Sequence, residues 1–218
     1  MKVVEIFTSI EGEGKRAGLP ATFIRLFGCN LRCSYCDSMY AVEGTDYTEM
    51  SITEIMDKTE EIGCPNITVT GGEPLIHPEI EDLLMALCLR GFWVNVETNG
   101  SVIPTYRPMD SRLFSRLFYT VDYKTGSSGM RDKMVSHVFK RLSMFDILKF
   151  VVGTETDLQE ALALYKELCP MAKVYVSPVF GCIEPEQIVQ FILKNRVWDW
   201  KVQLQLHKFI WSPDMKGV

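Results

Sequence analysis

The chain alternates between short apolar runs and longer stretches in which apolar residues recur at helical spacing. The short runs are rich in β-branched and aromatic residues and predict strands over 21–28, 66–72, 92–98, 117–124, 146–152 and 173–178. A last strand is possible in "WKVQLQLH", residues 200–207. Between these runs, apolar residues three and four positions apart predict helices over 52–62, 78–90, 155–168 and 185–195.

Local signals support the helix boundaries. Ser51 and Glu54 form a possible capping box before 52–62, and Pro78 suits the first turn of 78–90. Strands joined by crossover helices run parallel, so an α/β fold is expected, either an open doubly wound sheet or a full or partial βα barrel. In both architectures, ligands bind at the carboxyl ends of the strands.

The residues with distinctive chemistry fall at those strand ends. A cysteine-rich loop follows the first predicted strand, "GGEP" (71–74) follows the second, "ETNG" (97–100) the third, and Lys124 the fourth. Because the carboxyl ends of parallel strands share one edge, these segments are expected to form one site.

Composition limits the functions that the chain can have. Its 218 residues are 47% hydrophobic, enough for one core, and we expect a single domain over 1–218. The 23 basic and 28 acidic residues give a net charge of -5 without blocks of like charge, which argues against a nucleic-acid partner. With no signal-peptide pattern and no apolar run of about 20 residues, a cytoplasmic protein without membrane contact is expected.

The loop "GCNLRCSYCDS" places Cys29, Cys33 and Cys36 close together. In a reducing compartment such thiolates indicate zinc, copper(I) or an iron-sulfur cluster rather than disulfides. Zinc requires a fourth ligand, and the chain's histidines are remote in sequence from the loop. Three cysteines on a four-iron cluster leave one iron open for a small molecule. The other cysteines, Cys64, Cys88, Cys169 and Cys182, are interpreted as small buried hydrophobic residues.

The C-x3-C-x2-C spacing, with Tyr35 before the last cysteine and "GGEP" after the next strand, resembles the radical S-adenosylmethionine superfamily. The resemblance implies that S-adenosylmethionine chelates the open iron and yields a 5'-deoxyadenosyl radical. The two glycines permit close backbone approach, and the Glu73 carboxylate suits an ammonium group such as that of methionine. Taken alone, the glycine pair is equally compatible with an ordinary strand-to-helix turn.

A longer likeness narrows the family. "EIFTSIEGEGKRAGLPATFIRLFGCNLRCSYCDS", "VETNG", "SSGM" and "QLQLHK" closely resemble the 7-carboxy-7-deazaguanine synthase family. This resemblance implies a truncated βα barrel that contracts the ring of 6-carboxy-5,6,7,8-tetrahydropterin with loss of ammonia, in queuosine and deazapurine biosynthesis. It also implies a [4Fe-4S] cluster, S-adenosylmethionine, Mg2+, a reductant such as flavodoxin or ferredoxin, and a homodimer.

The resemblance assigns a role to each matching position. The cluster ligands are Cys29, Cys33 and Cys36, and Ser38 is the Mg2+ ligand. The cofactor contacts are Tyr35, Asp37, Gly72, Glu73, Asp122, Tyr123 and Lys124. The substrate contacts are Ile10, Glu11, Gly12, Arg25, Thr70 and His207. Many family members have Ser-Pro-Lys where this chain has 122–124, so only the lysine is shared there.

Simpler explanations exist for several of these residues. Ser38 could cap a backbone N–H, "EGEG" could be a solvated turn, Arg25 a surface charge and His207 a packed residue. Two other functions are compatible with the cysteine loop: a glycyl-radical activating enzyme and a non-catalytic zinc-binding α/β protein. The segment "SIEGEG" and the "QLHK" tail argue against the first, and metal analysis would test the second.

Overall fold

The computed structural model describes residues 1–108, 110, 113, 115–213 and 215–218. Within them, a nine-stranded sheet has the order β3-β1-β2-β4-β5-β6-β7-β8-β9. Strands β2 to β9 run parallel to one another, and β1 pairs antiparallel with both β2 and β3. The strands are β1 Lys2–Ile10, β2 Pro20–Leu26, β3 Thr48–Glu49, β4 Asn66–Gly71, β5 Trp93–Thr98, β6 Leu117–Lys124, β7 Ile147–Val152, β8 Lys173–Pro178 and β9 Trp200–Val202.

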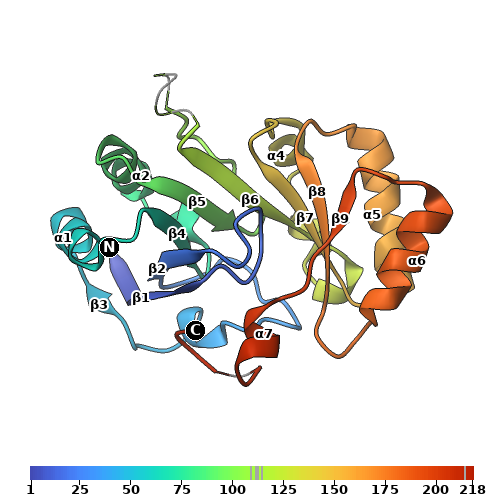
Figure 1. Ribbon diagram of the computed structural model, residues 1–218, viewed down its shortest axis with the longest axis horizontal. Coiled ribbons are helices and arrows are strands. Elements are labelled where there is room, and N and C mark those ends of the chain that lie inside the picture. Colours follow the sequence, from blue (N-terminus) through green and yellow to red (C-terminus); the bar gives the residue numbers. More distant parts are fainter. Residues whose placement is uncertain (109, 111–112, 114, 214) are drawn as a thin grey trace.

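The strand order decides between the two predicted architectures. From β4 to β9 each strand lies beside the next in sequence, without the reversal of order that defines a doubly wound sheet. Among the described residues, β3 and β9 are the ends of the sheet and do not pair with each other. The sheet is curved but open (Figure 1), which confirms the predicted partial βα barrel.

Helices cover the outer, convex face of this sheet (Figure 1). The longer ones are α1 Ile52–Ile62, α2 Ile80–Leu89, α5 Glu155–Leu168 and α6 Pro185–Asn195. Shorter helical segments are η1 Met39–Ala41, η2 Pro74–Ile76, η3 Gly126–Ser128, η4 Arg131–Lys133, α4 Ser136–Lys140 and α7 His207–Ile210. The apolar faces of the long helices and the outward side chains of the strands form one core.

The sequence signals for these elements are mostly confirmed. The Ser51 hydroxyl accepts from the Glu54 amide at 3.2 Å, and Glu54 accepts from the Ser51 amide at 2.7 Å, which completes the capping box. The predicted start of 78–90 is wrong, since α2 begins at Ile80 and a 3-10 turn over Pro74–Ile76 precedes it. The last strand is shorter than expected, ending at Val202.

Strands β1 and β3 were not predicted. β1 has only one fully buried residue, Val3, because both of its faces are partly covered. The regular alternation that marks a half-buried strand is therefore weak there, although the segment pairs along its whole length with β2. β3 contains only two residues, Thr48 and Glu49, which is too short for a periodic signal.

The inner face of the sheet is polar where the outer face is apolar. On β6, Tyr119, Val121 and Tyr123 join the outer core, whereas Asp122 and Lys124 point to the inner side and line a cavity. The same alternation places Thr70 of β4, Glu97 of β5 and Lys149 of β7 on the inner side. Polar inner residues thus converge near the carboxyl ends of four adjacent strands.

The β1–β2 connection, residues 11–19, crosses the inner face and closes one end of the open barrel. The Arg16 guanidinium donates to the backbone oxygens of Trp93 at 2.7 Å and Ile67 at 2.9 Å. On the other side, Gly14 exchanges two hydrogen bonds with the Gln203 side chain, at 2.8 and 3.0 Å. This loop forms part of the floor of the cavity.

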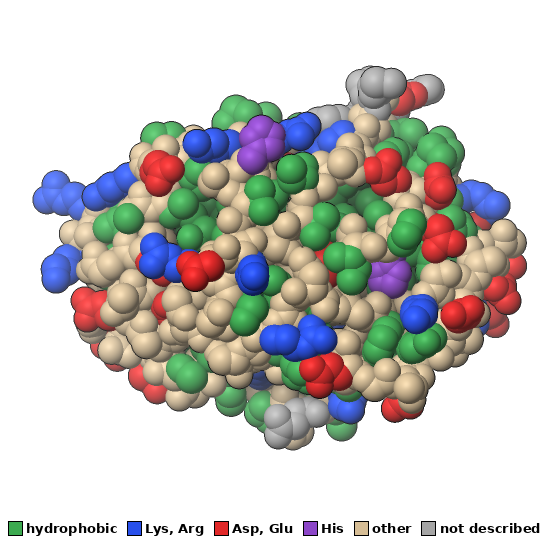
Figure 2. All heavy atoms as spheres, turned by 180° about the vertical axis from the view of Figure 1, so that it is seen from behind, with side chains coloured by type: hydrophobic (Ala, Val, Ile, Leu, Met, Phe, Trp, Pro, Cys, Tyr) green, Lys and Arg blue, Asp and Glu red, His purple; other side chains and the backbone are tan. Residues whose placement is uncertain are grey.

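The surface carries mixed charge (Figure 2), and the helices are short. In the described part of the chain, no helix has the length and apolar character needed to cross a membrane. Lys, Arg, Asp and Glu side chains all occur across the back face of the molecule (Figure 2).

Candidate active site

A cavity of about 710 Å³ lies at the carboxyl ends of the parallel strands. Most of the residues that the sequence singled out line it. They are Ile10, Glu11, Gly12, Arg25, Cys29, Cys33, Tyr35, Cys36, Asp37, Ser38, Thr70, Gly72, Asp122, Lys124 and His207. Two predicted residues, Glu73 and Tyr123, do not line the cavity.

The cysteine loop follows β2 and presents three half-buried thiols to this cavity. The Cys29 sulfur accepts from the Leu31 amide at 3.4 Å and from the Asn99 side-chain amide at 3.6 Å. Burial raises the pKa of the Cys33 thiol, and the nearby Lys124 ammonium opposes this shift. Within the described residues, no three His, Cys, Asp or Glu side chains converge as a metal-ligand set.

The donor set of this loop fits an iron-sulfur cluster. The three thiols are soft donors, and N–H donors directed at sulfur, as at Cys29, are typical of iron-sulfur centres, so the fit is one of donor chemistry rather than of converged side chains. Two of the three histidines are engaged elsewhere. His77 bonds to the Phe27 oxygen at 2.9 Å, and the His207 ring lies against Gly12.

The glycine pair after β4 holds the cysteine loop in place. A Cβ on Gly72 would lie 2.2 Å from the Gly28 oxygen and 2.9 Å from the Cys29 Cβ. Gly71 has a φ of +146°, and its Cβ would lie 2.1 Å from the Leu26 oxygen. The two glycines therefore allow the end of β4 to approach the start of the cysteine loop closely.

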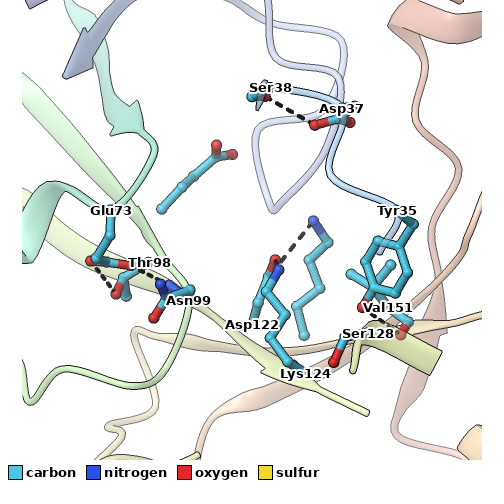
Figure 3. A network of polar contacts seen from close by, with 12 residues as sticks. Tyr35, Asp37, Ser38, Glu73, Thr98, Asn99, Asp122, Lys124, Ser128 and Val151 are labelled. Atoms are coloured by element: carbon cyan, nitrogen blue, oxygen red, sulfur yellow. Dashed lines mark hydrogen bonds and ion pairs between the residues drawn. The ribbon is translucent and has the colours of Figure 1, made fainter. Parts of the chain in front are cut away.

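Glu73 is buried behind the cavity wall and is bonded to the protein itself. Its carboxylate is fully buried and accepts from the Thr98 hydroxyl at 2.7 Å, the Asn99 amide at 2.6 Å and the Leu75 amide at 3.0 Å (Figure 3). Burial raises its pKa to about 7, and the three donors oppose that shift. Glu73 thus ties the end of β5 to the turn after β4, and its contact with a ligand ammonium stays a prediction.

The Tyr123 side chain points away from the cavity, and a cofactor contact at this position stays a prediction. Its ring packs against Phe139 and Phe150 on the outer side of the sheet, and its hydroxyl donates to Glu160 at 3.1 Å. Because neighbouring residues in a strand point to opposite faces, Asp122 and Lys124 face the cavity and Tyr123 does not.

Asp122 and Lys124 form an ion pair on the cavity floor, with Nζ and Oδ2 2.8 Å apart (Figure 3). Burial alone would lower the pKa of Lys124, but the Asp122 carboxylate outweighs it and the pKa is raised. Tyr35 lies beside this pair, and its hydroxyl donates to the Val151 oxygen at 3.5 Å. The arrangement offers a charged and a phenolic group next to the cysteine loop.

The Glu11 carboxylate is almost completely buried. It is 1% exposed, pairs with Arg16 at 2.6 Å and accepts from the Thr68 hydroxyl. Nearby, Thr70 donates to Glu97 at 2.9 Å. Burial raises the pKa of Glu97 to about 7, with the Glu11 charge acting in the same direction. Thr70 and Glu97 therefore form a hydrogen-bonded pair that faces the cavity.

Arg25 lies at the edge of the cavity, where a carboxylate and two aromatic rings contact its guanidinium. Its Nε donates to Glu5 at 2.7 Å, and the Tyr40 hydroxyl donates to the same carboxylate at 2.8 Å. The Phe7 and Tyr40 rings lie 5.9 and 5.7 Å from the guanidinium carbon. Its Nη groups have no hydrogen-bond partner among the described residues and remain free to bind an anion.

Asp37 and Ser38 lie together at the mouth of the site. The Ser38 hydroxyl donates to Asp37 at 2.9 Å (Figure 3). The Lys208 ammonium lies 3.6 Å from the other carboxylate oxygen of Asp37. Burial opposes ionisation, but Lys208 and Ser38 hold the pKa of Asp37 below its usual value. These hard oxygen atoms fit a magnesium ion better than a soft metal.

The carboxyl-terminal segment completes the cavity wall. The Leu206 amide donates to the Gly12 oxygen at 3.0 Å, so His207 lies over the predicted substrate segment. Residues 213 and 215–218 also line the cavity, and the Lys216 ammonium lies 4.4 Å from the centre of the Tyr40 ring.

Some features of the site were missed. Lys149 and Glu97 were not assigned roles, although a lysine within "ILKFVV" and a glutamate ending "WVNVE" interrupt apolar runs and could have been noticed. The expected burial of the remaining cysteines is confirmed for Cys88, whereas Cys169 and Cys182 are exposed and Cys64 is half-buried.

Known proteins resemble this chain in sequence along its whole length. Residues 23–123 match the family model described as the radical SAM superfamily. A 7-carboxy-7-deazaguanine synthase from Clostridium acetobutylicum is 42% identical over 100% of this chain and 99% of its own length. The namesake from Chlorobaculum tepidum is 38% identical, over 100% and 97% of the two chains.

The chain belongs to the 7-carboxy-7-deazaguanine synthase family. It is an enzyme of the radical SAM superfamily, whose members use a [4Fe-4S] cluster and S-adenosylmethionine. The fold agrees with the crystal structure of QueE from Escherichia coli, with a TM-score of 0.75, 22% identity and coverage of 94% and 93% of the two chains. Streptococcus suis SuiB bound to S-adenosylmethionine shares the fold at a TM-score of 0.57 and 12% identity, over 84% of this chain and 46% of SuiB.

Proposed function

We propose that this enzyme converts 6-carboxy-5,6,7,8-tetrahydropterin to 7-carboxy-7-deazaguanine with loss of ammonia, as a carbon-nitrogen lyase of queuosine and deazapurine biosynthesis. One observation carries the proposal: a single cavity joins the cysteine loop to the predicted substrate segment and to Arg25. Full-length relatives that bear the synthase name support it.

The cofactor side of the cavity is proposed to lie along the cysteine loop and β6. When bound, the reduced cluster and S-adenosylmethionine supply a 5'-deoxyadenosyl radical that removes a hydrogen atom from the substrate. Gly72 lines the cavity beside the loop, and Asp37 and Lys124 offer charges to the polar ends of the cofactor. Tyr35 provides a half-buried ring next to Cys36.

The substrate side is proposed to lie between β1, β2 and the carboxyl-terminal segment. The free Nη groups of Arg25 suit the substrate carboxylate in a bidentate contact. Ile10 and Gly12 line the same cavity, and Thr70 of β4 is the register partner of Arg25 on β2. This placement would hold the reacting ring carbon between Arg25 and the cysteine loop.

A magnesium ion is proposed at Ser38, completed by substrate oxygens and water, which this ion tolerates. Such an ion would orient the substrate carboxylate and stabilise charge during ring contraction. An electron-donating flavodoxin or ferredoxin and assembly as a homodimer are part of the same proposal, by resemblance to the family.

The test is an anaerobic assay of the reconstituted enzyme with S-adenosylmethionine, reductant, Mg2+ and 6-carboxytetrahydropterin, with products followed by mass. We expect 7-carboxy-7-deazaguanine together with ammonia. A Cys33→Ala variant should lose both iron and activity, because one of three cluster ligands is removed. Formation of 5'-deoxyadenosine without the deazapurine would refute the substrate assignment and leave the radical chemistry standing.

A further inference from the structure

Lys149 is a buried cation in the centre of the cavity floor. It interrupts the apolar run of β7, and its side chain is only 7% exposed. Its ammonium lies 2.5 Å from Oε2 of Glu13 and 3.6 Å from Oδ1 of Asp122. A buried ammonium requires this kind of compensation, and the two carboxylates raise the pKa of Lys149 despite its burial.

The two carboxylates come from different sides of the site. Glu13 directly follows the predicted substrate segment Ile10–Gly12, in the loop that crosses the barrel. Asp122 is the ion-pair partner of Lys124 on the cofactor side. Lys149 is therefore the one described side chain whose ammonium contacts a carboxylate on each side.

Removal of this cation would affect both sides at once. Glu13 would lose its ion-pair partner Lys149, Asp122 would keep only Lys124, and the Oε1 atom of Glu13 is already buried without a hydrogen-bond partner among the described residues. The crossing loop is anchored on both sides of Glu13, by the Gly12 oxygen to the Leu206 amide and by Gly14 to Gln203, and the Glu13 side chain between these anchors is held by Lys149.

We propose that Lys149 is a positioning residue that fixes the substrate segment relative to the cofactor segment, acting through Glu13 and Asp122. This inference rests on the proposed function and deepens it. A shift of about 1 Å between radical and substrate can lower reaction efficiency strongly, so loss of Lys149 should uncouple cofactor cleavage from product formation.

The experiment compares Lys149→Met and Lys149→Arg with the wild-type enzyme, all reconstituted and normalised to bound cluster. Lys173→Met is the matched control, because Lys173 is exposed at the start of the neighbouring strand β8. Two quantities are measured: the ratio of 5'-deoxyadenosine to deazapurine product, and the Kd of the pterin substrate with S-adenosylmethionine present.

For Lys149→Met we expect the ratio to rise at least about fivefold and the substrate Kd to rise at least about tenfold. Lys149→Arg keeps the charge and should stay within about threefold of wild type, and Lys173→Met should be unchanged. A role in stability alone would lower the yield of loaded enzyme while leaving the ratio and the Kd at wild-type values, and that result would overturn the proposal.

Glu13→Gln keeps the proposal testable if Lys149→Met does not fold. It should reproduce the rise in the ratio, and a wild-type ratio in Glu13→Gln would contradict the route through Glu13. When Lys149→Met and Glu13→Gln are combined, the rise in the ratio should be smaller than the sum of the two single effects, because both changes remove the same Lys149–Glu13 contact. Failure of the proposed function has a different signature, because the wild-type enzyme would then form no deazapurine at all.

Discussion

Gly72 lies so close to Gly28 that a Cβ at position 72 would be 2.2 Å from the Gly28 oxygen. This contact joins the end of β4 to the start of the cysteine loop. Gly72→Ala should displace the loop, because the obstructing atoms belong to the backbone and cannot rotate away. We expect the reconstituted variant to retain less than about half of the wild-type iron and sulfide, measured by chemical analysis and visible absorbance.

The matched control for that prediction is Gly126→Ala. Its added Cβ would meet nothing closer than 3.6 Å, from the Asp157 carboxylate, so cluster content should match wild type. Full iron and sulfide content in Gly72→Ala would show that the close approach is not needed to hold the loop.

Arg25 should control substrate affinity rather than cofactor cleavage. Loss of a bidentate contact to a carboxylate costs about 1.5–3 kcal/mol, or roughly 10- to 100-fold. Arg25→Lys should raise the KM for the pterin about tenfold, and the exposed Arg90→Lys should leave it unchanged. The uncoupled formation of 5'-deoxyadenosine without substrate should be the same in all three proteins. An unchanged KM in Arg25→Lys would remove Arg25 from the substrate site.

Ser38 should determine the response to Mg2+. Ser38→Ala removes a hard oxygen from the proposed ion site, so half-maximal activity should require at least about fivefold more Mg2+. Ser38→Thr keeps the hydroxyl and serves as the control. The same Mg2+ titration curve for Ser38→Ala and wild type would contradict the assignment.

Glu97 should make stability depend on pH. Its pKa is raised in the folded protein to about 7 by burial and by Glu11, from 4.5 as the ordinary value. A carboxyl whose pKa rises on folding favours the folded state while it is protonated, and that advantage is lost as the pH rises from about 4.5 through 7. Glu97→Gln, which mimics the protonated form, should match wild type near pH 5 and unfold at a higher temperature near pH 8.

Thermal unfolding of both proteins at several pH values measures this difference. The exposed Glu167→Gln on α5 controls for loss of a charge and should follow wild type at every pH. A difference in melting temperature between Glu97→Gln and wild type that does not grow with pH would show that Glu97 is not the titrating group.

The sequence predicts the fold well where periodicity is strong. The parallel strands and the four long helices have clear apolar patterns, and the cysteine loop, "GGEP" and Lys124 identify the edge that carries the site. The pattern is weak for β1, whose faces are both partly covered, and the strand was missed. Choice between a doubly wound sheet and a barrel depends on strand order, a long-range property that local patterns do not contain.

Side-chain direction explains why two of the predicted site residues do not line the cavity. Glu73 lies in the predicted motif but its carboxylate is fully occupied by Thr98, Asn99 and Leu75. Tyr123 lies between two cavity residues but points to the opposite face of β6. The role of Lys149 depends on Glu13, 136 residues away in sequence, and such a contact has no local signal.

The central claim is that the cavity brings the pterin within reach of the cofactor-derived radical. The most direct test is turnover with substrate deuterated at C6 under anaerobic conditions, followed by mass analysis of 5'-deoxyadenosine, S-adenosylmethionine and product. We predict that deuterium leaves the substrate and appears in 5'-deoxyadenosine and in recovered S-adenosylmethionine, as expected if the cofactor is regenerated. Formation of the deazapurine with no deuterium in either adenosyl compound would contradict the account.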